Sequence, residues 1–156
     1  MSDSFLDTSA LVKRQARERG QAWVRARCDR RAGHTIAISE AALVEVVASF
    51  ARMARENPPR LSIADRDRFI RRFQQQVRRG YLVVLLNRAV LMRAAALCRI
   101  HPLRADDAVQ LACALAQRAD DVAAGRPAST FVSAAGDLLS IAQAEGVTVE
   151  NPHAYP

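Results

Sequence analysis

The chain has 156 residues, of which half are hydrophobic and only 5% aromatic, and its formal net charge is +7. This length predicts one domain with an aliphatic core. The excess of arginine favours a polyanionic partner such as nucleic acid, although a coding bias towards arginine would produce the same excess. No apolar stretch approaches the roughly 20 residues of a membrane helix, and the N-terminal residues lack the features of a signal peptide. We therefore expect a cytoplasmic protein with no membrane partner.

Segments with the pattern of strands and of helices alternate along the chain. Strands are expected at residues 3–7, 35–38, 81–86, 130–133 and 146–149, and helices at 9–31, 39–56, 62–78, 87–98, 106–115 and 137–145. Because parallel strands need crossover connections, this alternation predicts an α/β fold, a three-layer α/β/α sandwich around a mostly parallel sheet of about four or five strands. We expect residues 1–156 to form one domain, with a helical arm at about 40–79. The continuous apolar run at 81–86 is typical of a strand covered on both faces.

An aspartate follows the first expected strand. Asp7 lies where the C-terminal ends of parallel strands bind ligands, and the hydroxyl residues Thr8 and Ser9 come directly after it. An aspartate before a helix is also a favourable N-cap, but Thr8 or Ser9 could cap this helix instead. A carboxylate beside two hydroxyl groups is more than capping requires, which favours a ligand site.

Two further acidic positions lie far along the chain. Glu45 is in the most apolar helical segment, 41–50, where a carboxylate loses hydration unless an arginine or a metal compensates it. Asp106 and Asp107 begin a later helix, and consecutive helical positions point in different directions, so one should face solvent and the other the sheet edge. Since like charges repel without a cation, three carboxylates from distant segments indicate mainly a divalent-metal site.

Several short motifs recur in an order that is more specific than any one of them. They are residues 6–13, 38–46, 103–112, 130–139 and 144–147. On these motifs the chain resembles the PIN-domain family, and more narrowly the toxin ribonucleases of VapBC toxin–antitoxin pairs. The resemblance extends over nearly the whole chain. It implies a PIN-like fold, an RNA substrate, a Mg²⁺ or Mn²⁺ cofactor, a cognate antitoxin as partner and, in many members, a homodimer.

The resemblance assigns roles to single residues. Asp7, Glu45 and Asp107 match the acids of the family's metal site, which supports hydrolysis of a phosphodiester bond by an activated water. Thr8 and Ser9 would support that site. The antitoxin would dock in the groove between the first helices and block the acids.

One position departs from the family pattern. The family commonly has an aspartate where this chain has Ala135. Asp137 would point roughly 200° away on a helix start and would reach the site only if the loop differs. Ser133 is better placed to hydrogen-bond a ligand water. We therefore expect a metal site of reduced affinity, with a second metal position weakened most.

Other readings of the same residues stay open. Arg14 and Arg104 flank the acidic motifs and could contact RNA phosphates, or could be ordinary solvated arginines. Gln110, one turn after Asp107, could line the pocket or face solvent. The missing acid favours an alternative function, a catalytically impaired PIN-like protein that binds RNA or a partner. A weaker alternative is an unrelated phosphatase with Asp7 as nucleophile, although the expected Asp-x-Asp pattern is absent.

Overall fold

In a computed structural model of the protein, the described residues 3–156 form a sheet of five parallel strands in the order β3-β2-β1-β4-β5. The strands are β1 (Ser4–Leu6), β2 (Ile36–Ser39), β3 (Leu82–Val84), β4 (Thr130–Val132) and β5 (Val149–Glu150). Met1 and Ser2, on which the expectation of no signal peptide partly rests, lie outside the described residues. The predicted α/β fold with a parallel sheet is confirmed.

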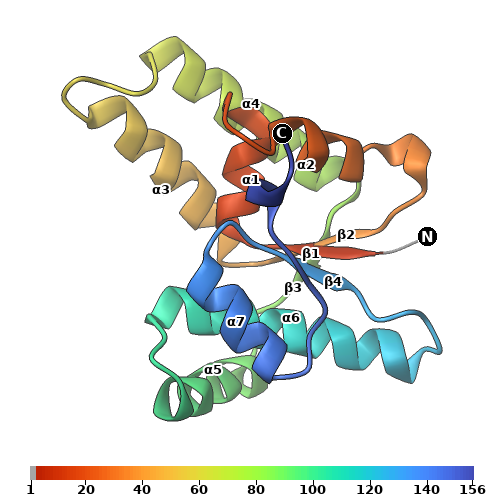
Figure 1. Ribbon diagram of the computed structural model, residues 1–156. Coiled ribbons are helices and arrows are strands. Elements are labelled where there is room, and N and C mark those ends of the chain that lie inside the picture. The colour runs from red at the N-terminus through yellow and green to blue at the C-terminus, as the bar shows by residue number, and fades with distance from the viewer. Residues whose placement is uncertain (1–2) are drawn as a thin grey trace.

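Helices cover both faces of the sheet (Figure 1). One face carries α1 (Thr8–Gln15), α2 (Gln21–Arg27), α3 (Ala42–Arg55) and α4 (Ile63–Gly80), and the other carries α5 (Arg88–Ile100), α6 (Ala105–Ala123) and α7 (Gly136–Ala144). Neighbouring residues of a strand point to opposite faces, so Leu6 of β1 packs into the first layer and Phe5 into the second. The predicted three-layer sandwich is therefore confirmed.

The expected helix at 9–31 is interrupted. Helix α1 ends at Gln15, and α2 begins after Gly20, whose φ of +83° is in the left-handed region. A Cβ at Gly20 would lie 2.3 Å from the backbone oxygen of Pro152, so only glycine permits this close approach. Pro152 belongs to a short 3₁₀ helix, η2 (Pro152–Ala154), which is thereby held against α2.

The apolar run at 81–86 forms an edge strand, which corrects the expectation of a strand covered on both faces. Strand β3 pairs only with β2, and the side chains of Leu82 and Leu85 are 41% and 61% exposed. Helices α5 and α6 cover only part of this edge, because the sheet ends there. In residues 3–156, no helix combines the length and apolar character that crossing a bilayer requires.

Helices α3 and α4 lie side by side and project from the sheet (Figure 1). Phe50 of α3 and Phe69 of α4 hold them together, with ring centroids 5.5 Å apart. The N-terminal end of α3 stays close to β2, which brings Glu45 to the same end of the sheet as Asp7.

Candidate active site

A cavity of about 580 Å³ lies at the end of the sheet where β1 and β4 terminate, and we call it the acidic cavity. Asp7 follows β1 directly, Glu45 is in the first turn of α3, and Asp107 is in the first turn of α6. All three line the cavity. The crossover connections of the parallel sheet therefore bring together acids that are far apart in the sequence.

Asp7 is buried, with only 4% of its surface exposed, and its carboxylate is held on both sides. Its Oδ1 accepts hydrogen bonds from Ser9 Oγ at 2.7 Å and from the Ala10 backbone N–H at 2.9 Å. Its Oδ2 accepts one from Ser133 Oγ at 2.6 Å. Asp7 is thus the N-cap of α1 as well as a cavity residue, so Thr8 and Ser9 do not replace it as the cap.

Burial raises the pKa of Asp7 to about 6, well above the ordinary value of 3.8. The hydrogen bonds from Ser133, Ser9 and Ala10 lower it and so oppose this effect, and the nearby charge of Asp107 adds to it. The ionised carboxylate is therefore held at an electrostatic cost that a cation would relieve.

Glu45 is half-buried and is fixed by two polar side chains from other helices. Its Oε2 accepts a hydrogen bond from Thr8 Oγ1 and another from Gln110 Nε2, the latter at 2.7 Å. The Gln110 amide also donates to Thr8 Oγ1 at 3.2 Å, so the three side chains form one network. Gln110 is buried and lines the cavity, and its Oε1 has no hydrogen-bond partner in the described structure.

The two adjacent aspartates of α6 face different surroundings, as expected. Asp106 is exposed and pairs with Arg104, with 3.3 Å between Nε and Oδ1. Asp107 is half-buried, and its pKa is raised by burial first and then by the charges of Asp106 and Glu45. The charge of Arg104 lowers the pKa of Asp107, although Arg104 forms its ion pair with Asp106.

The loop after β4 is tied to the start of α1 by hydroxyl groups. The buried Ser133 donates to Asp7 itself, and its Oγ accepts the backbone N–H of Ala135 at 3.0 Å. Ser9 Oγ accepts the backbone N–H of Ala134 at 2.8 Å. Ser133 therefore positions a carboxylate directly, whereas the sequence suggested a contact to a ligand water.

Ala135 lines the acidic cavity, at the N-cap of α7. Its side chain cannot cap the helix, so the position has neither a carboxylate nor a capping group. Asp137 is exposed in the first turn of α7 and is not among the described residues that line the cavity. Asp137 thus does not take the place of the acid missing at Ala135.

Sequence reasoning missed the cationic side chains of this cavity. Lys13, Arg52 and Arg60 line it, and Glu18 pairs with Lys13 and with Arg60 at 3.0 Å each. A signal for two of them was present, since Lys13 is four residues after Ser9 and Arg52 is seven after Glu45, which are same-face spacings on a helix. His153 of η2 also lines the cavity, and no local pattern pointed to it.

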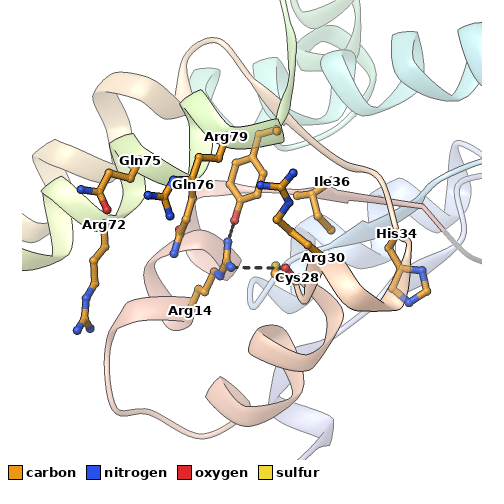
Figure 2. Close-up of a pocket in the computed structure, with 11 residues that line it drawn as sticks. Arg14, Cys28, Arg30, His34, Ile36, Arg72, Gln75, Gln76 and Arg79 are labelled. Atoms are coloured by element: carbon orange, nitrogen blue, oxygen red, sulfur yellow. Dashed lines mark hydrogen bonds between the residues drawn. The ribbon is translucent and has the colours of Figure 1, made fainter.

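The predicted RNA contact Arg14 lies elsewhere. It is not among the described lining residues of the acidic cavity, and it belongs instead to a cavity between α1, the segment after α2 and α4 (Figure 2). Arg104 does not line the acidic cavity either, but it approaches through its ion pair with Asp106.

The oxygen atoms around Asp7 suit a hard divalent cation, although the carboxylates are not gathered into a tight cluster. Within residues 3–156, no group of three or more His, Cys, Asp and Glu side chains has the arrangement of a metal site. Mg²⁺ keeps several waters and needs only one or two carboxylates. Asp7 Oδ2 accepts a single hydrogen bond, the Asp107 carboxylate accepts none from the described residues, and Gln110 Oε1 is unpartnered. Oxygen atoms with free acceptor capacity are the kind of ligand that a hydrated Mg²⁺ or Mn²⁺ takes.

Comparison with known proteins identifies a family model and several similar folds. The family model described as PIN domain matches residues 4–126. Similar structures include a toxin–antitoxin complex from Klebsiella pneumoniae, with 16% identity, a TM-score of 0.63, and 96% of this chain and 98% of that chain covered. VapBC2 from Rickettsia felis, bound to a DNA fragment from its promoter, has 12% identity, a TM-score of 0.59 and coverage of 95% and 97%.

A third similar structure is FitAcB from Neisseria gonorrhoeae, with 16% identity, a TM-score of 0.59, and coverage of 95% of this chain and 96% of that chain. No curated protein matches the sequence. At these identities the structural likeness establishes the fold, and the chemistry of the acidic cavity has to be argued from its own residues.

Proposed function

Because this chain belongs to the PIN-domain family, we propose that it is a metal-dependent endoribonuclease and the toxin of a VapBC-type toxin–antitoxin pair. The main support is the convergence of Asp7, Glu45 and Asp107 on one cavity that also carries Lys13 and Arg52. Carboxylates suit a divalent cation, and a guanidinium such as that of Arg52 suits the phosphates of an RNA strand.

Each acid would have a distinct part in hydrolysis. Asp7, through its Oδ2, and Asp107 would hold Mg²⁺ or Mn²⁺, and Glu45 would act directly or through water. When bound, the cation supplies positive charge for the phosphate and activates water. Ser133 and the Ala10 backbone N–H hold the Asp7 carboxylate in place before any ligand arrives. Thr8 and Gln110 do the same for Glu45.

The proposed antitoxin would bind across the first helices. This proposal is supported by the similarity to a toxin–antitoxin complex from Klebsiella pneumoniae and by a cavity of about 760 Å³ that residues of α1, α3 and α4 line. Leu82, Leu85, Leu91 and Met92 are exposed apolar side chains on β3, the following loop and α5, which supports the proposal of a homodimer through this face. Co-expression of this chain with the product of a small neighbouring gene tests the proposed antitoxin. We expect RNA cleavage to be lost in the presence of that product.

A cleavage assay tests the proposed activity. The purified chain is incubated with several structured RNAs and Mg²⁺ or Mn²⁺, beside Asp7→Asn, Ala135→Asp and, as a matched control, Asp137→Asn. We expect cleavage to be lost in Asp7→Asn and unchanged in Asp137→Asn, because Asp137 does not line the cavity. Cleavage should rise in Ala135→Asp, since this change adds a carboxylate at a cavity position that is also an uncapped helix start.

Ala135 favours a second candidate function, a PIN-like protein that binds RNA or a partner without efficient cleavage. In that case neither the wild type nor Asp7→Asn cleaves any of the RNAs, while RNA binding persists in Asp7→Asn. Restored cleavage in Ala135→Asp alone would identify the loss of that acid as the cause.

A further inference from the structure

A second cavity, of about 380 Å³, is lined by four arginines, Arg14, Arg30, Arg72 and Arg79, and we call it the basic cavity. None of its described lining residues is an aspartate or a glutamate. The described lining residues of the two cavities do not overlap. Its volume is in the range of about 300–1,000 Å³ that is usual for small-ligand pockets. A concave surface with this charge is suited to an anion.

One face of α4 supplies a wall of the basic cavity. Arg72, Gln75, Gln76 and Arg79 recur at the spacing that aligns side chains on one side of a helix, and Figure 2 shows them in a row along α4. The sequence carries a signal for this wall, since residues 68–105 contain nine arginines and no acidic residue. Arg79 therefore has no acid nearby in sequence, and the acid nearest to Arg72 is Asp67, five residues before it.

Arg14 forms the inner part of the cavity. Its guanidinium donates hydrogen bonds to the Tyr81 hydroxyl and, at 3.5 Å, to the backbone oxygen of Cys28 (Figure 2). Burial lowers the pKa of Arg14, and no carboxylate in the described chain forms an ion pair with it. On the far side, His34 Nδ1 is buried without a hydrogen-bond partner. The cavity thus contains a half-buried guanidinium that no carboxylate pairs.

Several arginines elsewhere on the protein form ion pairs. Examples are Arg60 with Glu18, Arg68 with Asp65, Arg93 with Glu145 and Arg126 with Asp121. The side chains of Arg30, Arg72 and Arg79 form no ion pair or hydrogen bond within residues 3–156. Attraction to the C-terminal end of α4 accounts for Arg79 alone, because Arg14 and Arg30 come from other segments.

We propose that the basic cavity binds a phosphate group, carried either by a free nucleotide or by an RNA strand. Guanidinium groups match the charge and the paired oxygens of phosphate, and several of them converge here from three segments of the chain. Gln75 and Gln76 add amide donors beside them. The proposal concerns binding alone and does not depend on cleavage at the acidic cavity.

Equilibrium binding to the full chain, in buffer free of divalent metal, tests this proposal. The probes are adenosine 5′-monophosphate, inorganic phosphate and a labelled short single-stranded oligoribonucleotide. The test variant is Arg72→Gln/Arg79→Gln, and the matched control is Arg88→Gln/Arg99→Gln, which removes the same charge from exposed positions of α5. We expect the test variant to bind the oligonucleotide about tenfold more weakly, with a shallower salt dependence, and the control to bind as the wild type does.

The outcomes separate the two sources of phosphate. Weaker binding of the mononucleotide and the oligonucleotide supports a free-nucleotide site, whereas weaker binding of the oligonucleotide alone supports contact with a strand. Equal weakening in the test and control variants would overturn the proposal, because it would indicate only overall charge. Displacement of the oligonucleotide by an acidic peptide but not by either phosphate compound would also overturn it, by showing a carboxylate-binding protein interface.

Discussion

Helix α1 contributes to two cavities that hold their charges in opposite ways. At its N-terminal end Asp7 enters the acidic cavity, and in its last turn Arg14 enters the basic cavity. Asp7 and Glu45 are each fixed by hydrogen bonds from other segments. Among the described arginines of the basic cavity, Arg14 alone is fixed in this way, and the outer arginines Arg30, Arg72 and Arg79 are exposed.

This difference fits two kinds of recognition. Chemistry at a phosphodiester bond depends on atomic positions, so hydrogen bonds that orient carboxylates before a ligand arrives are useful at the acidic cavity. Holding an anion depends mainly on charge, and exposed arginines suffice for that. The fold therefore fixes the positions of carboxylates at the acidic cavity, whereas it gathers positive charge at the basic cavity.

The largest expected effect concerns the adjacent aspartates of α6. Asp107→Asn removes a carboxylate of the proposed metal site and should lower RNA cleavage by at least about 100-fold. Asp106→Asn is the matched control, and it should change the rate by less than about threefold, because Asp106 is exposed and paired with Arg104. Rate measurements at several Mg²⁺ concentrations check both. Equal losses in the two variants would contradict the assignment of Asp107.

The next effect concerns the stability of the metal-free protein. Because the pKa of Asp7 is raised to about 6 in the folded state, folding favours its protonated form, and stability falls as pH rises from about 4 through 6. Asp7→Asn keeps the shape without the charge and should stabilise the protein at pH 7 by up to roughly 3 kcal/mol. Below about pH 4 this gain should vanish, because Asp7 is then protonated in both states.

Urea unfolding of wild type and variant across this pH range measures the difference, with Asp137→Asn as an exposed control. A variant that is less stable than the wild type at pH 7 would show that the hydrogen bonds of the Asp7 carboxylate outweigh its burial. Added Mg²⁺ should stabilise only the wild type, and more strongly at pH 7 than at pH 5.

The sequence predicted the parts of this molecule that depend on local patterns. Alternating strand and helix segments were enough for the parallel sheet, because parallel strands need crossover connections. Asp7, Glu45 and Asp107 could be proposed from their positions and from the family resemblance, and the structure places them around one cavity.

Other features depend on contacts that no local pattern encodes. The break at Gly20 is needed because Pro152, more than a hundred residues away, approaches its backbone. The exposed edge of β3 follows from strand order, since an apolar run looks the same at the edge as at the centre. Likewise, the sequence does not decide whether Gln110 lines the pocket or faces solvent. The fold brings its side chain to Glu45.

A smaller effect is expected at the network around Glu45. Gln110→Met removes the hydrogen bonds to Glu45 and Thr8 and should lower cleavage about tenfold by releasing Glu45. Stability should change by less than about 1 kcal/mol, because the change also removes the unpartnered Oε1. Gln117→Met is the control, since Gln117 is buried against Asp121 outside the acidic cavity and should affect stability without affecting cleavage. The opposite pattern would make Gln110 a purely structural residue.

The smallest effects should separate the inner and outer arginines of the basic cavity. Arg14→Gln removes the hydrogen bonds to Tyr81 and to the Cys28 backbone and should cost about 1–2 kcal/mol in the free energy of unfolding. Arg72→Gln should change it by less than about 0.5 kcal/mol, since Arg72 is exposed and forms no contact that folding needs. Urea unfolding of both variants measures this difference. A loss at Arg72 as large as that at Arg14 would mean that the outer arginines hold the fold together, and their exposure could then no longer be taken as availability for an anion.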